Sequence, residues 1–159
     1  MVHIAQAKHP IPVRRHSGSK TLAHFARELN KRYTLQAFLP SMIEKNHGRI
    51  VALLSLAAFL GATHGTVYCP TKTAIKVLME AVSDELRIYS KGKSLIKFTT
   101  IYPAVVLTGL FKKPRTRYVY ITKGLTPQDA ASLIIDAQRQ NVRERSIPSY
   151  WLLIIRLFR

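Results

Sequence analysis

The strongest constraint on the fold is a pair of short apolar runs with a helical pattern between them. The runs are Ile50 to Leu54 and Leu95 to Tyr102, while Tyr68 to Ile88 repeats apolar residues at helical spacing. Continuous apolar runs of this length are typical of strands that are buried on both faces of a sheet. A strand, a crossover helix and a second strand form a parallel pair. The sequence therefore predicts an α/β fold with a mostly parallel sheet.

The segments around this unit divide the chain into three parts. Residues 1–20 are irregular and basic, residues 21–148 form the predicted domain, and residues 149–159 form an apolar and basic C-terminal segment. The first part is polar and holds two prolines, so it does not resemble a signal peptide. No stretch reaches the roughly 20 apolar residues that a membrane-spanning helix needs. We thus expect one folded domain with two short flanks.

Turn residues mark the expected helix boundaries. A helical pattern runs from Leu22 to Lys45, and Pro40 inside it should kink or divide the helix. Gly48, which follows an Asn-His pair, suits a left-handed cap at the end of this pattern. A later helix should begin with Thr126 as its cap and Pro127 in its first position.

The charge balance favours an acidic partner without identifying one. The chain has 25 Lys and Arg against 8 Asp and Glu, a formal net charge of +17. Such an excess suits nucleic acid, anionic lipid or a polyphosphate ligand. The basic residues are spread over the flanks of the apolar middle with no long run, so a solvated surface is the simpler interpretation. No pattern of stacked aromatics or recognition helix supports nucleic acid, which we consider unlikely.

The cysteine content excludes small domains that are stabilised by disulfides or by zinc. The single cysteine, Cys69, cannot form an internal disulfide, and no spacing of Cys and His resembles a zinc site. We therefore expect no metal. A lone thiol suits a reducing compartment or the cytosolic face of a membrane.

Three polar side chains have the spacing of a proton-transfer site. Ser55 ends the first predicted strand, where parallel sheets place their ligands, and Tyr68 and Lys72 lie one turn apart on one helix face. A hydride transfer between an alcohol and a nicotinamide needs a group that takes or gives the hydroxyl proton. A free phenol has a pKa of about 10, and a nearby ammonium lowers that pKa toward neutral pH. We predict that Lys72 acts in this way on Tyr68, and that Ser55 donates to the substrate oxygen.

The surrounding motifs resemble those of the short-chain dehydrogenases/reductases. They are Ser55 with Tyr68-Cys69-Pro70-Thr71-Lys72, the run Ala37-Phe38-Leu39-Pro40-Ser41-Met42, the run Asn46-His47-Gly48-Arg49-Ile50-Val51, and Pro103 followed by Thr108-Gly109. Together they are similar to the branch of 17-beta-hydroxysteroid dehydrogenases 11 and 13 and the epidermal retinol dehydrogenases, over residues 34–148. The resemblance implies the C-terminal part of a Rossmann-like doubly wound domain.

The resemblance also implies a role for each residue. Tyr68 is the proton donor or acceptor, Ser55 orients the substrate, and Lys72 tunes Tyr68 and binds the nicotinamide ribose. Tyr68, Pro103 and Thr108 would also contact the cofactor, Thr108 at its carboxamide. The implied reaction interconverts a lipophilic alcohol, steroid- or retinol-like, and its carbonyl with NAD or NADP. A homo-oligomer is compatible with this assignment.

This chain departs from the family pattern in its first half. Its seven glycines never form the Gly-rich turn on which cofactor phosphates rest, and the 54 residues before Ser55 are too few for the strands that normally come first. Lys20 stands where the resemblance places a catalytic asparagine, and Ala104 stands where the family usually has glycine. We therefore expect a truncated chain, inactive by itself, as a misjoined gene model, a splice variant or a decaying copy would be.

Two alternatives stay open for partners and location. The segment from Tyr150 to Arg159 is too short to span a bilayer, and its apolar residues beside Arg suit either an interfacial helix on anionic lipid or a helix that packs on the domain. The resemblance implies an endoplasmic reticulum membrane or a lipid droplet, with the cytoplasm as the alternative. The main rival to an enzyme is a non-catalytic fragment that binds membranes or related dehydrogenase subunits.

Overall fold

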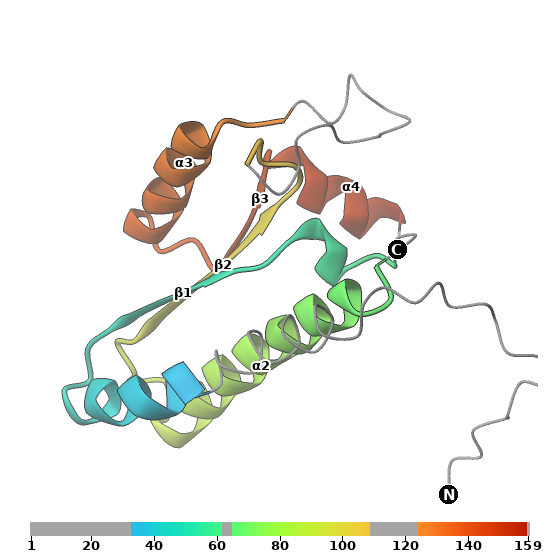
Figure 1. Ribbon diagram of the computed structural model, residues 1–159. Coiled ribbons are helices and arrows are strands. Elements are labelled where there is room, and N and C mark those ends of the chain that lie inside the picture. The colour runs from blue at the N-terminus through green and yellow to red at the C-terminus, as the bar shows by residue number, and fades with distance from the viewer. Residues whose placement is uncertain (1–32, 62–64, 109–123, 159) are drawn as a thin grey trace, which may run out of the picture.

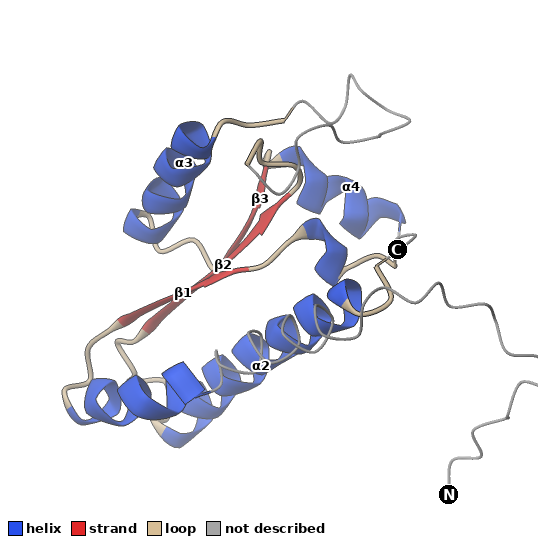
Figure 2. Ribbon diagram, viewed as in Figure 1, coloured by secondary structure: helices blue, strands red, loops and turns tan. Residues whose placement is uncertain are grey.

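The computed structural model describes residues 33–61, 65–108 and 124–158. A helix that ends at residue 44 comes first. The elements that follow are β1 (Arg49–Leu53), the short 3-10 helix η1 (Leu56–Ala58), α2 (Tyr68–Tyr89), β2 (Lys97–Pro103), α3 (Pro127–Arg139), β3 (Glu144–Ile147) and α4 (Tyr150–Phe158). Figure 2 shows these helices around one small sheet.

The described strands form one parallel sheet in the order β1-β2-β3. Val51 of β1 is opposite Thr99 of β2, and Thr100 of β2 is opposite Glu144 of β3. The central strand β2 is the most buried, because it has a neighbour on each side. The predicted α/β fold with a parallel sheet is therefore confirmed.

Helices cover both faces of this sheet, as Figure 1 shows for α2 and α3. The alternation of side chains along β2 sends Tyr102 to the α2 face and Ile101 to the α3 face, and both are fully buried. Two cores result, the larger against α2 and the smaller against α3. The larger core contains Ala52, Leu54, Ala58, Ile75, Met79, Tyr102 and Leu152, and the smaller contains Ile101, Ala137 and Ile147.

One expectation for the first strand is wrong. We expected burial on both faces, but Val51 and Leu53 are exposed, while Ala52 and Leu54 pack in the core against α2. The reason is that α3 packs on β2 and β3, while β1 lies at the edge of the described sheet. One apolar face of β1 therefore has no cover among the described elements.

The first helix differs from its expected form in two details. Pro40 does not divide it, since the helix continues through that position to residue 44. Proline costs the helix one backbone hydrogen bond, but its fixed φ is itself helical and Pro40 is exposed. The left-handed residue after the helix is Asn46, with φ 44°, rather than Gly48. Gly48 is needed for space instead, because a Cβ there would lie 2.7 Å from the sulfur of Met42.

Most other boundaries follow the expected chemistry. The Thr126 side chain accepts a hydrogen bond from the Asp129 backbone and caps α3, with Pro127 at the start of the helix, which confirms that prediction. After α2, Lys91 and Gly92 are left-handed, with φ 52° and 78°. The strand β3 was not predicted at all, because Glu-Arg-Ser-Ile is short and mostly polar.

The C-terminal helix α4 packs on the domain. Leu152 and Ile155 are buried, and Leu152 joins the larger core beside Tyr102. Of the two interpretations left open for this segment, the structure supports packing. No helix in the described ranges is long and apolar enough to cross a membrane. The predicted irregular part, residues 1–20, lies outside the described residues.

Candidate functional site

The predicted site residues gather where the parallel strands end. Ser55 follows β1, Tyr68 begins α2, and Pro103 is the last residue of β2. Figure 1 shows η1 beside the first turns of α2, and the two elements pack against each other. The carboxyl edge of a parallel sheet is where α/β proteins bind their ligands.

Tyr68 and Lys72 are in contact on one face of α2. The Lys72 ammonium lies 5.4 Å from the centre of the Tyr68 ring. Lys72 is buried, with 8% of its surface exposed, and Tyr68 is half-buried. Burial of an ammonium is costly, so a buried lysine beside a phenol is unusual for a purely structural position. The predicted contact between these two residues is present.

Ser55 caps the short helix η1. Its hydroxyl oxygen accepts a hydrogen bond from the backbone N–H of Ala57 at 3.2 Å. A hydroxyl that accepts one hydrogen bond still carries its own proton for donation. Ser55 is half-buried, and its position at the end of β1 is the one predicted.

Two threonines hold this corner together, and sequence analysis did not identify them. The Thr73 hydroxyl lies 3.0 Å from the carbonyl oxygens of both Ala58 and Cys69 and donates to them. The first of these bonds ties α2 to η1. The Thr71 hydroxyl donates to the carbonyl oxygen of Tyr68 at 2.8 Å. No spacing rule reveals the bond to Ala58, because it joins two elements that only the fold brings together.

The two remaining predicted residues lie further along the chain. Pro103 is opposite Ile147 of β3, at the same sheet edge as Ser55. Thr108 follows a bridge between Val106 and Leu125, is exposed, and donates its backbone N–H to the carbonyl oxygen of Val106 at 2.9 Å. The structure thus joins Tyr68 and Lys72 directly and places Ser55 and Pro103 nearby, with Thr108 on the following loop.

A polar cluster that reaches from the buried Tyr102 to the exposed Arg156 supports the sheet next to the site. The Tyr102 hydroxyl donates to Glu144 at 2.7 Å, and Arg156 of α4 donates to the other oxygen of Glu144 at 3.0 Å. Burial raises the pKa of Tyr102, and the hydrogen bond to Glu144 raises it further. The ring of Phe59 lies 4.6 Å from that of Tyr102. This cluster, which the sequence did not reveal, links β2, β3 and α4.

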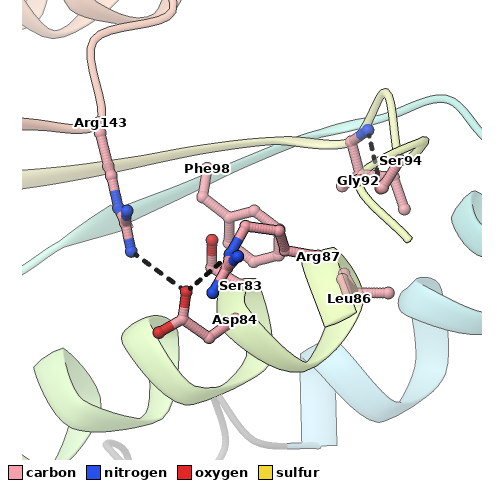
Figure 3. A pocket seen from close by; sticks show the side chains of 9 residues that line it. Ser83, Asp84, Leu86, Arg87, Gly92, Ser94, Phe98 and Arg143 are labelled. Carbon is pink, nitrogen blue, oxygen red and sulfur yellow. Dashed lines mark hydrogen bonds and ion pairs between the residues drawn. The ribbon is translucent and has the colours of Figure 1, made fainter. Parts of the chain in front are cut away.

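The described residues form two surface hollows that are lined by neither Tyr68 nor Lys72. One is an open apolar groove of about 830 Å³ along η1 and the outer face of α2, beside Cys69 and Val77. The other, about 120 Å³ and shown in Figure 3, lies at the far end of α2 beside Asp84.

The donor groups fit only part of a nicotinamide dinucleotide. In the role that the resemblance implies, Lys72 beside Tyr68 would meet a ribose hydroxyl. The phosphates of such a cofactor rest on the backbone of a Gly-rich turn at a helix start. No junction of strand and helix in the described ranges carries that turn. Those same ranges contain no group of three or more His, Cys, Asp or Glu side chains that could hold a metal.

Comparison with known families shows which protein family has this arrangement. The family model described as short chain dehydrogenase matches residues 32–118, more than half of the chain. The chain belongs to the short-chain dehydrogenase family. The matched stretch includes Ser55, Tyr68, Lys72, Pro103 and Thr108. Members of this family are oxidoreductases that generally use NAD or NADP.

Three curated relatives support the branch that the motifs indicated. Short-chain dehydrogenase/reductase family 16C member 6 of Bos taurus is 35% identical over 105 residues, 66% of this chain and 33% of the relative. Human 17-beta-hydroxysteroid dehydrogenase 13 is 33% identical over 77% of this chain and 39% of the relative. Epidermal retinol dehydrogenase 2 of Mus musculus is 32% identical over 76% of this chain and 38% of the relative. The resemblance to this branch is confirmed.

A solved structure supports the fold and shows how much of it is present. A short-chain dehydrogenase from Burkholderia cenocepacia, solved in complex with NADP, aligns with a TM-score of 0.68 at 16% identity. The alignment covers 84% of this chain and 52% of that one. The predicted fold, part of a Rossmann-like doubly wound domain, is confirmed. The chain spans about a third to two fifths of the length of the three relatives above.

Proposed function

We propose that this chain provides the proton-transfer half of an oxidoreductase that interconverts a lipophilic alcohol and its carbonyl. The observation that carries the proposal is the buried Lys72 ammonium 5.4 Å from the Tyr68 ring, at the carboxyl edge of the sheet. The pair thus supplies a hydroxyl that can give and take a proton, with a cation beside its ring.

Each residue acts on a defined proton. The Tyr68 hydroxyl gives its proton to the carbonyl oxygen during reduction and takes it back during oxidation. The Ser55 hydroxyl, held by Ala57, donates a hydrogen bond to the same substrate oxygen. Bound NAD or NADP would supply or accept the hydride. Pro103 and Thr108 would line the cofactor side of the site.

The substrate class is inferred from the relatives. Two of them are named for steroid and retinol substrates, which are lipophilic alcohols. The proposal for this chain is therefore a steroid- or retinol-like alcohol, acted on at an endoplasmic reticulum membrane or a lipid droplet.

A second candidate is a non-catalytic fragment that binds membranes or related dehydrogenase subunits. The observation in its favour is the uncovered apolar face of β1, where Val51 and Leu53 are exposed at the edge of the described sheet. Exposed strand edges and apolar faces favour pairing with another chain.

Restoring the Gly-rich half separates these candidates. We would join the N-terminal part of the bovine relative to residues 33–159 and assay retinol and a small water-soluble alcohol with NAD and NADP. We expect cofactor-dependent turnover, with kcat/KM at least about tenfold higher for retinol because apolar burial favours it. The unmodified chain is the control and should show none. A composite domain that folds and binds cofactor but turns over neither alcohol would favour the non-catalytic fragment.

A further inference from the structure

The end of the molecule opposite Tyr68 carries a turn that mixes exposed apolar and basic side chains. We call residues 88–95, the last two residues of α2 and the loop that follows toward β2, the basic turn. Ile88, Tyr89 and Leu95 have 63%, 83% and 59% of their surfaces exposed. Lys91 and Lys93 are exposed between them. Three large apolar side chains are thus exposed within eight residues of the chain, and apolar side chains exposed together often mark an interaction surface.

Hydrogen bonds give the basic turn one defined shape. Lys91 donates its backbone N–H to the carbonyl oxygen of Ile88 at 3.0 Å. The Asn46 side chain spans the neighbouring loop, accepting from the Leu95 backbone at 3.0 Å and donating to the Lys93 carbonyl oxygen at 3.2 Å. Because Asn46 belongs to the loop after the first helix, its exposed neighbour Lys45 joins the same surface.

Basic side chains outnumber acidic ones around the basic turn: Lys45, Lys91 and Lys93 are exposed, and Glu44 and Glu85 are their exposed acidic neighbours. No carboxylate within the described ranges forms an ion pair with Lys91 or Lys93. Beside the turn, Asp84 is shared by Arg87 at 3.4 Å and Arg143 at 3.8 Å, as Figure 3 shows. One carboxylate between two guanidinium groups leaves this side of the turn cationic as well.

We infer that the basic turn docks on the surface of an anionic phospholipid bilayer. Aliphatic and tyrosine side chains at the tip suit the boundary between headgroups and acyl chains, and lysines beside them suit anionic headgroups. The sheet places the turn at the amino ends of its strands, whereas Tyr68 and Ser55 lie at the carboxyl ends. Docking therefore leaves the carboxyl edge of the sheet facing away from the lipid. The inference about docking does not depend on the proposed reaction.

Vesicle flotation with the full 159-residue chain tests this inference. The chain should bind phosphatidylcholine vesicles that contain phosphatidylserine and should not bind vesicles of phosphatidylcholine alone. High salt should release it from the anionic vesicles. The double variant Lys91→Gln/Lys93→Gln should weaken the partition coefficient at least about tenfold. The double variant Tyr89→Ser/Leu95→Ser should weaken it as well, because it removes the apolar part of the contact. Circular dichroism checks that each variant folds as the parent does.

A matched pair on α4 separates the two ends of the molecule. Leu153 and Leu157 are also exposed, so Leu153→Ser/Leu157→Ser is the control, and it should bind anionic vesicles as the parent does. Loss of binding in that control with normal binding in the basic-turn variants would overturn the inference in favour of the C-terminal helix. Equal binding to neutral vesicles, no binding to either, or binding to an oligonucleotide but not to anionic vesicles would also overturn it.

Discussion

Lys72 is a buried cation near the start of a helix, where two effects oppose it. Burial removes water from the ammonium, and the positive end of the helix dipole repels it. Positions of this kind persist where chemistry needs them. The contact with the Tyr68 ring gives the cost of Lys72 a functional reason.

Tyr102 makes the stability of the chain sensitive to alkaline pH. Burial and Glu144 raise the pKa of its hydroxyl in the folded state. The unfolded chain loses that proton at a pH of about 10, while the folded chain keeps it. The contribution of Tyr102 is thus fully present below pH 10 and decreases as the pH rises further.

Tyr102→Phe should therefore flatten the alkaline loss of stability. We expect the midpoint of thermal unfolding to fall less steeply above a pH of about 10 in the variant than in the parent. At neutral pH the variant should be less stable, by about 1 kcal/mol, since it removes the hydrogen bond to the half-buried Glu144. Tyr89→Phe is the matched control, because Tyr89 is exposed. Parallel alkaline profiles for Tyr102→Phe and the parent would refute the linkage.

At the scale of elements, α4 shows how one helix divides its side chains between core and solvent. Leu152 packs against Tyr102 in the larger core, while the next residue, Leu153, is exposed. Arg156 on the same helix pairs with Glu144 of β3. The helix is thus held by buried apolar side chains, by the ion pair, and by the Leu152 backbone N–H, which donates to the Ser146 hydroxyl at 2.9 Å.

Leu152→Ala should destabilise the chain by about 2–4 kcal/mol, because it leaves a cavity in the core. Leu153→Ala should change the free energy of unfolding by less than about 0.5 kcal/mol, as exposed positions usually do. Urea titration of both variants measures the difference. Equal effects would mean that α4 is not docked on the sheet in solution.

Hydrophobic periodicity in the sequence predicted the helices and strands that bury one regular face, and it missed elements without such a face. The bounds of α2 and β2 agree with the sequence to within about two residues, because their apolar patterns are long. The strand β3 escaped notice, since a four-residue polar segment becomes a strand only through pairing with β2. In the site, Tyr68 and Lys72 share one helix and were predictable by spacing. The bond from Thr73 to Ala58 was not, because it depends on how η1 meets α2.

At the scale of the molecule, the described strands form a three-stranded parallel sheet with β1 at its edge. Tyr68 and Lys72 are in contact, while the described ranges offer no Gly-rich turn for cofactor phosphates. Lys72 and Thr108 offer a few hydrogen bonds, each worth about 1 kcal/mol net. Association costs at least about 4 kcal/mol in lost translation and rotation.

The 159-residue chain alone should therefore bind NADH and NADPH no more tightly than about 1 mM. Calorimetry and nicotinamide fluorescence measure this directly, with the composite domain described above as the positive control. Saturable binding below about 100 μM, some 1.4 kcal/mol tighter, would show that the chain forms another phosphate site.

The central claim is that Tyr68 transfers the substrate proton, and Tyr68→Phe in the composite domain tests it most directly. We predict that kcat falls at least about a hundredfold, as loss of a general acid or base requires. Cofactor Kd should change little, because the ring and its packing remain. Lys72→Met should lower kcat and also weaken cofactor binding. Turnover within a few fold of the parent in a folded, cofactor-binding Tyr68→Phe variant would contradict the account.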